Sequence, residues 1–384
     1  MASYAFETIT AAEAQSIKAG DTLTLAGPAR SVAVSYTPLG LPLPAQIILT
    51  AGGRTVAFGT ELSELSLRGG VRVADGSKLF IGDFGSNGTI GSDLGGGLYG
   101  GGGGDTLLGR AGDDFIHGNS GDDSLQGGEG HDTVYGGQGA DTIVIGLEGD
   151  RNSGGFGHGN LGEDTLIGGA GADTLLGGQD ADRLSGGEGD DYLSGDLGDD
   201  EIRAGGGADE IYGGSGNDSL FSGGGSDFIR GGDGSDFIVS EGQGFVWIDG
   251  GAGDDTIVVA GIGMDRIRGG EGRDRFEVIA GERPGVDQIH AIHDWQADES
   301  LHFNQVGIYT LGAERYAETT ADDMQQAIAR ARDLMGQGKA HVAVQVNGDV
   351  YVFAETNGDP ADGPDAAVSL VGVGLDAVDW TNFY

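Results

Sequence analysis

The sequence predicts an all-β repeat protein, a solenoid of short parallel strands closed at both ends by smaller caps. A nine-residue pattern occurs seventeen times between Gly100 and Glu277. Glycine supplies 81 of the 384 residues and is concentrated in these repeats, which argues against an ordinary α/β domain. No proline occurs between Ala45 and Arg283. This fits uninterrupted strand ladders, because proline has no N–H to donate to them. A short, fixed period of this kind indicates a stacked repeat architecture.

Each repeat divides into a turn and a strand. Its first six residues predict a turn, in which glycine supplies the positive φ angles that other residues resist. Its last three predict a short strand with one inward apolar residue, such as Leu107 or Ile116, because side chains alternate across a strand. A strand of three residues buries little alone. Stacked repeats would share one continuous apolar core.

Aspartate stands at the sixth position of every repeat, and glycine at the fourth in all but one, where Asp180 replaces it. Each turn thereby places a carboxylate beside main-chain carbonyls. Calcium takes six to eight oxygen ligands, whereas magnesium demands a stricter octahedron and keeps more water. We therefore predict calcium. The candidate ligands are Asp105, Asp114, Asp123, Asp132, Asp141, Asp164, Asp173, Asp182, Asp191, Asp200, Asp209, Asp218, Asp227, Asp236, Asp255, Asp265 and Asp274.

The repeat reads GGxGxDxUx, where U is a large apolar residue, and the chain resembles the RTX (repeats-in-toxin) proteins. The resemblance covers about half of the residues. It implies a parallel β-roll in which two nonapeptides make one coil and turns on one side share ions, roughly 10–15 calcium ions in total. It also implies export by type I secretion machinery through an uncleaved C-terminal signal, followed by folding outside the cell.

The charge and the composition limit which partners the chain can bind and where the protein is expected to be found. The net charge is −41 with three lysines, which excludes nucleic acid and anionic lipid as direct partners. Without calcium the repeat carboxylates would repel one another, so we expect disorder without the ion and folding with it. The chain has no cysteine and therefore no disulfide. The first residues lack the features of a Sec-type signal peptide. No apolar run is long enough to insert into a membrane. A secreted, extracellular or cell-surface protein is expected.

The flanking segments and two interruptions complete the domain prediction. Residues 1–80 predict a β-rich domain or cap, with Thr10 and Glu13 as the capping box of a short helix. Residues 81–99 predict degenerate capping coils, and 100–277 the roll. The interruption at 145–158 predicts a surface loop. In the interruption at 240–249, Phe245 and Trp247 are expected to plug the core, or alternatively to present an aromatic contact. The stretch Pro38–Pro44 predicts a packed turn, with an exposed docking loop as the alternative.

Residues 278–384 predict an α+β cap that contains the secretion-signal region. His290 and His293 fall on opposite faces of a strand, which disfavours a zinc site. A helix is expected to begin at Thr320–Asp323 and to reach about Met335. Asn347 and Gly348 predict a type I′ hairpin turn. The acidic loop with Asn357, Asp359, Asp362 and Asp365 lacks the pattern of an EF-hand, although one extra calcium ion there remains an alternative.

No catalytic motif was found. The sequence contains no HExxH, no GxSxG and no P-loop. We therefore predict a non-enzymatic, calcium-binding structural protein that self-assembles in a surface layer, filament or extracellular matrix. The alternative is an adhesin or carbohydrate-binding module that contacts cell-surface polysaccharide and uses the roll as a spacer. A hydrolase with an unrecognised site is a third hypothesis.

Overall fold

The computed structural model describes residues 2–37, 46–146, 154–262, 264–279, 290–296, 298–304, 316–354, 364, 366–378 and 380–382. It contains two compact units, Met1–Tyr192 and Leu193–Tyr384. The stretch Pro38–Pro44 and the acidic loop with Asn357, Asp359, Asp362 and Asp365 lie outside the described residues, as does the middle of the first interruption, residues 147–153. Among the described residues, no helix is both long enough and apolar enough to span a membrane.

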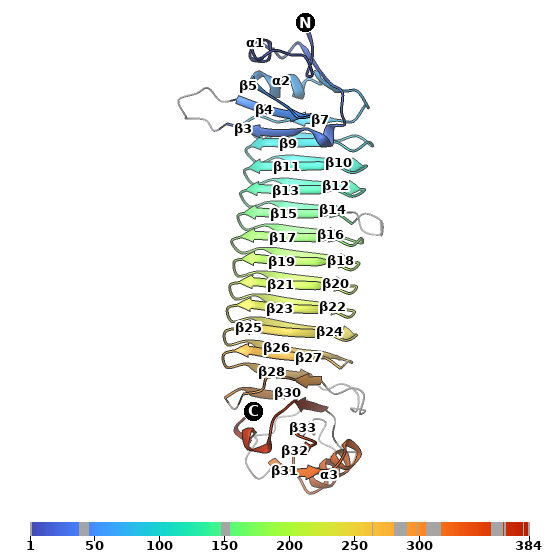
Figure 1. Ribbon diagram of the computed structural model, residues 1–384, viewed down its shortest axis with the longest axis vertical. Coiled ribbons are helices and arrows are strands. Elements are labelled where there is room, and N and C mark those ends of the chain that lie inside the picture. Colours follow the sequence, from blue (N-terminus) through green and yellow to red (C-terminus); the bar gives the residue numbers. More distant parts are fainter. Residues whose placement is uncertain are drawn as a thin grey trace. The chain divides into compact units, whose positions relative to one another are not determined.

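The first unit begins with two small sheets and two helices (Figure 1). A parallel sheet has the order β1 (Ser3–Ala5), β2 (Thr22–Leu25), β6 (Val71–Val73), and an antiparallel one the order β3 (Ala33–Tyr36), β4 (Gln46–Ala51), β5 (Arg54–Gly59). The helices are α1 (Ala11–Gln15) and α2 (Glu61–Leu67). The predicted capping box is confirmed, because Thr10 and Glu13 exchange hydrogen bonds through side chain and main chain. One buried apolar cluster contains Phe6, Leu49 and Leu62 and extends to Tyr99. The N-terminal segment therefore covers the first coils of the roll.

The repeats of the first unit form two parallel sheets (Figure 1). The even-numbered strands are β8 (Gly88–Ile90), β10 (Thr106–Ala111), β12 (Ser124–Glu129), β14 (Thr142–Gly146), β16 (Thr165–Gly169) and β18 (Arg183–Glu188). The odd-numbered strands are β7 (Leu79–Ile81), β9 (Gly97–Gly102), β11 (Phe115–Ser120), β13 (Thr133–Gln138), β15 (Phe156–Leu161) and β17 (Thr174–Gln179). Neighbours within a sheet are commonly 18 residues apart, as in Thr106↔Ser124 and Phe115↔Thr133. Two nonapeptides therefore make one coil, as the resemblance implied.

The repeats of the second unit are built in the same way. Its even-numbered strands are β20 (Glu201–Gly206), β22 (Ser219–Gly224), β24 (Phe237–Gln243), β26 (Thr256–Ile262), β28 (Arg275–Ile279) and β30 (Ser300–Asn304). Its odd-numbered strands are β19 (Tyr192–Leu197), β21 (Glu210–Ser215), β23 (Phe228–Asp233), β25 (Trp247–Ala252), β27 (Arg266–Glu271) and β29 (His290–Ile292). The parallel β-roll predicted for the repeats is thus confirmed in both units.

The strands are longer than the three residues predicted. Most have six residues, because pairing continues from the end of one nonapeptide into the first three residues of the next, as in Arg110↔Gly128. Those residues need no side chain to pair, since the ladder is formed by main-chain groups. The turn is correspondingly shorter, and both ends of it use left-handed backbone. Asp180, the one departure from glycine at the fourth position, has φ of +74°. Aspartate is among the residues that tolerate this conformation best.

The apolar residue at the eighth position of each repeat points inward. Leu107 pairs with Leu125, and Leu125 with Ile143, and all three are buried. Gly157 interrupts the neighbouring column, and Ile145 occupies the space that its missing side chain leaves, since a Cβ at Gly157 would lie 3.0 Å from the Cδ1 of Ile145.

The core plug predicted at residues 240–249 is wrong. Ile248 pairs with Ile229 and is buried, so the alternation along the strand turns Trp247 to the outer face. Phe245 is 44% exposed. Val246, between the two rings, is the buried residue. The alternative expectation, an aromatic contact, stays a prediction.

The second unit ends in a small α+β cap. β34 (Ala366–Leu370) adds to β29, and β33 (Asp349–Ala354), β32 (His341–Val346) and β31 (Tyr316–Ala321) follow in order. Helix α3 (Met324–Gly336) packs on them through Ala327, Ala331 and Met335. The helix begins later than predicted, because Thr320 still belongs to a strand and Asp323 is the N-cap. Asn347 and Gly348 both have positive φ, as the predicted hairpin turn requires.

Candidate calcium sites of the repeats

All seventeen repeat aspartates are buried, with exposed fractions of 0–3%. Each stands immediately before a strand, as Asp105 stands before β10 and Asp114 before β11. Because strands of one sheet stack in register, the aspartates of each unit fall into two columns, one beside each sheet. The sequence placed these residues in turns but did not predict that their side chains would be inaccessible to solvent.

One carboxylate oxygen of each aspartate in a column belongs to the fold. The main-chain N–H of Asp105 donates to Oδ1 of Asp123 at 2.7 Å, and that of Asp123 donates to Oδ1 of Asp141 at 2.8 Å. The same bond recurs in both units, with N···O distances of 2.7–3.1 Å. Where no aspartate precedes, another residue donates, as Val246 does to Asp265 at 3.0 Å. Oδ1 therefore links consecutive coils.

The other oxygen, Oδ2, is buried without a hydrogen-bond partner in many of the repeats. Among the described residues this holds for Asp105, Asp114, Asp123, Asp132, Asp141, Asp164, Asp173, Asp218, Asp227, Asp236, Asp255 and Asp274. Leaving a buried carboxylate oxygen unpaired is costly, because ionised groups lose hydration that nothing replaces. A bound cation would replace that hydration. The recurrence of the same unpartnered atom is the structural feature that fits calcium.

Main-chain carbonyls converge on the same place. A Cβ added at Gly118 would overlap Oδ2 of Asp123 and lie 2.7 Å from the carbonyl oxygen of Gly136. Equivalent crowding occurs at Gly136 and Gly159. A side chain is therefore excluded at these three first positions, although Ala204, Ser222 and Ala260 occupy the first position of other repeats. The carboxylate and carbonyl oxygens that a side chain would have displaced are the hard donors that calcium prefers.

Burial perturbs these carboxyls strongly. Desolvation raises the pKa of Asp141 to about 8 and that of Asp105 to about 7. It raises the pKa of Asp123 to about 6, partly offset by the hydrogen bond from Asp105. The neighbouring aspartates of the column add to the rise for Asp218, to about 7. Protons and cations therefore compete for the same oxygens near neutral pH.

Asp265 differs from the others. Its Oδ2 lies 3.0 Å from Nδ1 of His290, and both side chains are buried. His290 occupies the next place in the same column, because Arg266 pairs with Ala291. The imidazole therefore stands where the other aspartates present a free oxygen. That Asp265 is a calcium ligand stays a prediction, and the geometry gives it a protein partner instead.

The repeat sequence and this geometry coincide with a known family. The family of RTX calcium-binding nonapeptide repeats matches residues 99–150 and 158–277 in overlapping four-copy segments. The chain is an RTX-repeat protein. Repeats of this family bind calcium, so the chain binds multiple calcium ions. No curated protein matches the RTX-repeat chain significantly.

Residues outside the matched repeats continue the two columns, and sequence reasoning missed them. Asn87 stands in the aspartate position before β8 and donates its N–H to Oδ1 of Asp105 at 2.5 Å. In the second unit, His290 precedes Ala291 and Glu299 precedes Ser300 in the same sense. The signal for Glu299 was present in the sequence, since Glu299-Ser300-Leu301 repeats the order of acid, spacer and apolar residue.

Proposed function

We propose that this RTX-repeat protein is an exported, non-catalytic structural protein that folds on calcium outside the cell and associates with copies of itself. The observation that carries the proposal is the burial of the unpartnered Oδ2 atoms inside the stack of coils. Ions held there would join one turn to the next rather than meet a substrate. Their role would then be structural, and the free energy of binding them would be free energy of folding.

The calcium requirement accounts for folding after export. In the absence of ions, burial of the repeat carboxylates opposes folding, and the net charge of −41 adds repulsion. Low free calcium inside a cell would leave the sites empty and the repeats unfolded. An unfolded chain is the form that type I secretion machinery, the predicted carrier, transports. Higher calcium outside would then drive folding.

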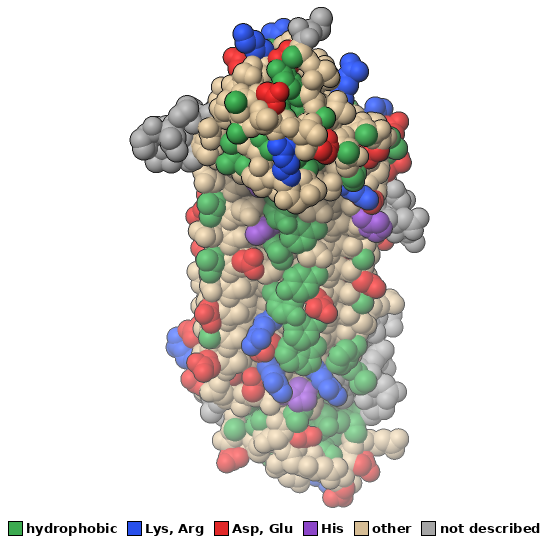
Figure 2. Space-filling model, turned by 45° about the horizontal axis from the view of Figure 1, so that its top comes forward, with side chains coloured by type: hydrophobic (Ala, Val, Ile, Leu, Met, Phe, Trp, Pro, Cys, Tyr) green, Lys and Arg blue, Asp and Glu red, His purple; other side chains and the backbone are tan. Residues whose placement is uncertain are grey.

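A cationic surface on the second unit supports self-association. We call it the arginine–aromatic patch and define it as Phe228, Arg230, Trp247, Arg266 and Arg268 on the outer face of β23, β25 and β27. The rings of Phe228 and Trp247 stack at 4.6 Å between centroids with an interplanar angle of 9°. The guanidinium of Arg268 lies 6.0 Å from the Trp247 ring. Figure 2 shows Lys and Arg side chains beside hydrophobic ones on the face of the molecule in view.

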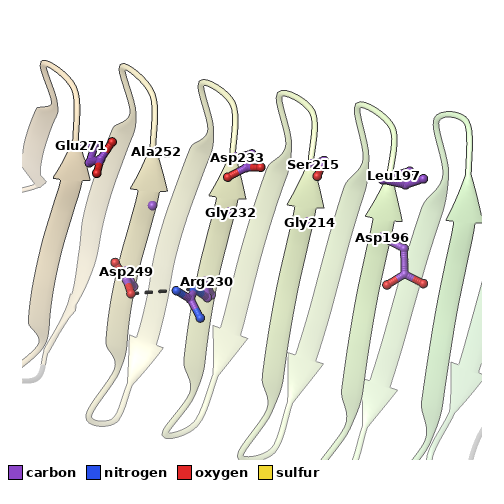
Figure 3. Close-up of a pocket in the computed structure, with 11 residues that line it drawn as sticks. Asp196, Leu197, Gly214, Ser215, Arg230, Gly232, Asp233, Asp249, Ala252 and Glu271 are labelled. Atoms are coloured by element: carbon purple, nitrogen blue, oxygen red, sulfur yellow. Dashed lines mark ion pairs between the residues drawn. The ribbon is translucent and has the colours of Figure 1, made fainter.

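Beside the patch lies a shallow, mainly acidic groove of about 620 Å³ (Figure 3). Asp196, Asp233 and Glu271 line it, and Arg230 reaches Asp249 there at 3.9 Å. The exposed arginines thus adjoin carboxylates of their own chain, and a second acidic copy offers more. Opposite charges side by side on one surface favour association between copies in a fixed register.

The test is the size of the purified full-length chain in millimolar calcium, measured by light scattering and electron microscopy. We expect particles far larger than a monomer with calcium and none with chelator. The variant R266E/R268E should need about tenfold more protein to assemble. The control R68E/R72E makes the same charge change on exposed residues of the N-terminal segment and should assemble normally. A folded chain that stays monomeric at all concentrations would refute self-assembly.

The second candidate is the adhesin or carbohydrate-binding module. The arginine–aromatic patch favours an acidic polysaccharide over a neutral one, because its arginines present positive charge beside the rings. A folded, calcium-loaded monomer that binds a polyuronate, and loses that binding in R266E/R268E, would support this candidate in place of assembly.

A further inference from the structure

The columns of aspartates continue beyond the matched repeats. Arg275 pairs with Ser300, as Thr256 pairs with Arg275 one coil earlier. Ser300 donates its N–H to the carbonyl of Asp274 at 3.0 Å, just as Arg275 donates to that of Asp255 at 2.8 Å. Glu299 therefore holds the place that Asp274 holds one coil before. The connection that leads to it is longer than a nonapeptide pair, so the spacing in the sequence hides the equivalence.

The carboxylate of Glu299, like those of the repeats, has one bonded and one unbonded oxygen, but its bonded oxygen accepts from a residue of its own turn rather than from the preceding coil. The residue is 2% exposed. Its Oε2 accepts a hydrogen bond from the N–H of Gln296 at 2.8 Å. Its Oε1 is buried and finds no hydrogen-bond partner within the described part of the chain, as is also true of Oδ2 of Asp274. The last two coils of this column thus each contain a buried carboxylate oxygen that has no hydrogen-bond partner within the described part of the chain.

The electrostatic surroundings of Glu299 call for a cation. Burial raises the pKa of Glu299 to about 8, and the charges that add to the rise are Asp274, Asp294 and Asp298. Asp294 lies close by, because its carboxylate accepts from the N–H groups of Gly269 and Gly270, each at 3.1 Å. A Cβ at Gly269 would in turn lie 2.7 Å from the carboxyl carbon of Asp274. Negative charge therefore accumulates around this last turn.

The other column of the second unit ends without this need. There His290 takes the final place, and its Nδ1 lies 3.0 Å from Oδ2 of Asp265. One column thus ends on an imidazole that contacts the last aspartate. The other ends on a second carboxylate that cannot neutralise the first. The column that ends at His290 therefore has a protein contact for its last aspartate, and the column that ends at Glu299 needs a cation.

We propose that Asp274 Oδ2 and Glu299 Oε1 share a calcium ion at the C-terminal end of the roll, outside the recognised repeats. Calcium suits the site because both donors are carboxylate oxygens, which are hard ligands that calcium prefers. The inference rests on the calcium-dependent folding of the roll.

The ion would connect the roll to the C-terminal segment. The carbonyl of Glu299 accepts from Nδ2 of Asn382 at 3.0 Å, and Nε1 of Trp295 donates to the carbonyl of Ala377 at 3.2 Å. Fixing Glu299 therefore fixes the loop against which the final residues pack.

Trp295 offers a local probe, because it lies between Asp294 and the Gln296 that binds Glu299. The experiment uses the full chain with W247F and W380F, so that Trp295 is the only tryptophan. Terbium replaces calcium, and its emission is followed with selective excitation of tryptophan. We expect saturable emission in the parent and at least about tenfold weaker binding in E299Q. The control E318Q makes the same substitution at an exposed residue of β31 and should match the parent.

Circular dichroism in calcium separates this proposal from the proposed function. If the roll does not fold with calcium, both ideas fail. If it folds but E299Q gives the same terbium curve as the parent, or the parent gives no emission from Trp295, the terminal site alone is refuted. A folded E299Q chain with weakened emission supports the site.

Discussion

The carboxylate of Asp123 is shared between the fold and the candidate ion. Its Oδ1 accepts the main-chain N–H of Asp105 at 2.7 Å, while its Oδ2 is buried without a hydrogen-bond partner among the described residues. The two oxygens of one side chain thus have separable roles. One links coil to coil by a hydrogen bond that involves no ion, and the other requires a cation. Substitutions can test the two roles independently.

Asparagine and alanine at position 123 should differ. D123N keeps an oxygen for the N–H of Asp105 and replaces the ligand oxygen by an amide, so a higher calcium midpoint is expected. D123A also leaves the buried N–H unpaired, which adds about 1–3 kcal/mol of destabilisation. Calcium titrations by circular dichroism and urea unfolding at saturating calcium measure the two effects. Equal behaviour of the two variants would show that the Oδ1 bond contributes nothing.

Glycine should be required at the first position of the repeat that begins at Gly118. G118A places a Cβ against the carboxylate of Asp123 and 2.7 Å from the carbonyl of Gly136. We expect destabilisation of about 1–3 kcal/mol from overpacking, together with weaker calcium binding. The control is G224A, where nothing lies within 4 Å of the new Cβ. Urea unfolding in calcium should leave G224A within about 0.5 kcal/mol of the parent. A G118A chain as stable as G224A would show that Asp123 and the carbonyl of Gly136 leave room for a side chain at position 118.

Without calcium, acid should favour the roll. Burial raises the pKa of Asp132 to about 7 and that of Asp141 to about 8, from an ordinary value of 3.8 in the unfolded chain. The folded chain then binds more protons between these values, so its stability without calcium falls as the pH rises from about 4 to 8. In chelator, circular dichroism should show more β-structure at pH 5 than at pH 8. Equal loss of β-structure at pH 5 and pH 8 would contradict the raised pKa values of these aspartates.

At saturating calcium this pH dependence should disappear between pH 6 and 8. The ion binds the ionised carboxylates, and the same carboxyls are ionised in the unfolded chain, so folding with calcium takes up no protons through them. The free energy of unfolding in saturating calcium, measured with urea, should therefore be the same at pH 8 and at pH 6. Stability that rises as the pH falls even in saturating calcium would mean that the buried carboxyls with raised pKa are not the ligands.

His290 should stabilise the last coil of the odd-numbered strands. H290A removes the partner of Asp265 Oδ2 and should cost about 1–3 kcal/mol at saturating calcium, because a buried carboxylate oxygen loses its contact. The control is H302A, since His302 lies half-buried in β30. Urea unfolding measures both. If H302A is the more damaging change, the Asp265–His290 contact does not hold the coil.

Particular residues show how far the sequence could be interpreted. Leu107, Leu125 and Ile143 form one buried column, as their period predicts, and the capping box at Thr10 and the turn at Asn347 are where local signals placed them. Trp247 was misassigned because its position within a strand depends on pairing with β23, which an insertion in the repeat concealed. Strand length was underestimated because glycine-rich residues pair through the main chain without any side-chain signal.

The sequence by itself determined a stack of short strands with calcium as the ligand, because both are encoded within nine residues and repeated, and the two-nonapeptide coil was implied by the resemblance to RTX proteins. Only the tertiary structure decided how each carboxylate is divided, since Oδ1 of Asp123 meets a main-chain N–H 18 residues away. It also decided that His290 and Glu299 end the columns. Those two residues follow connections of irregular length, and the stacking of strands, rather than the distance along the chain, brings them into register with the aspartates.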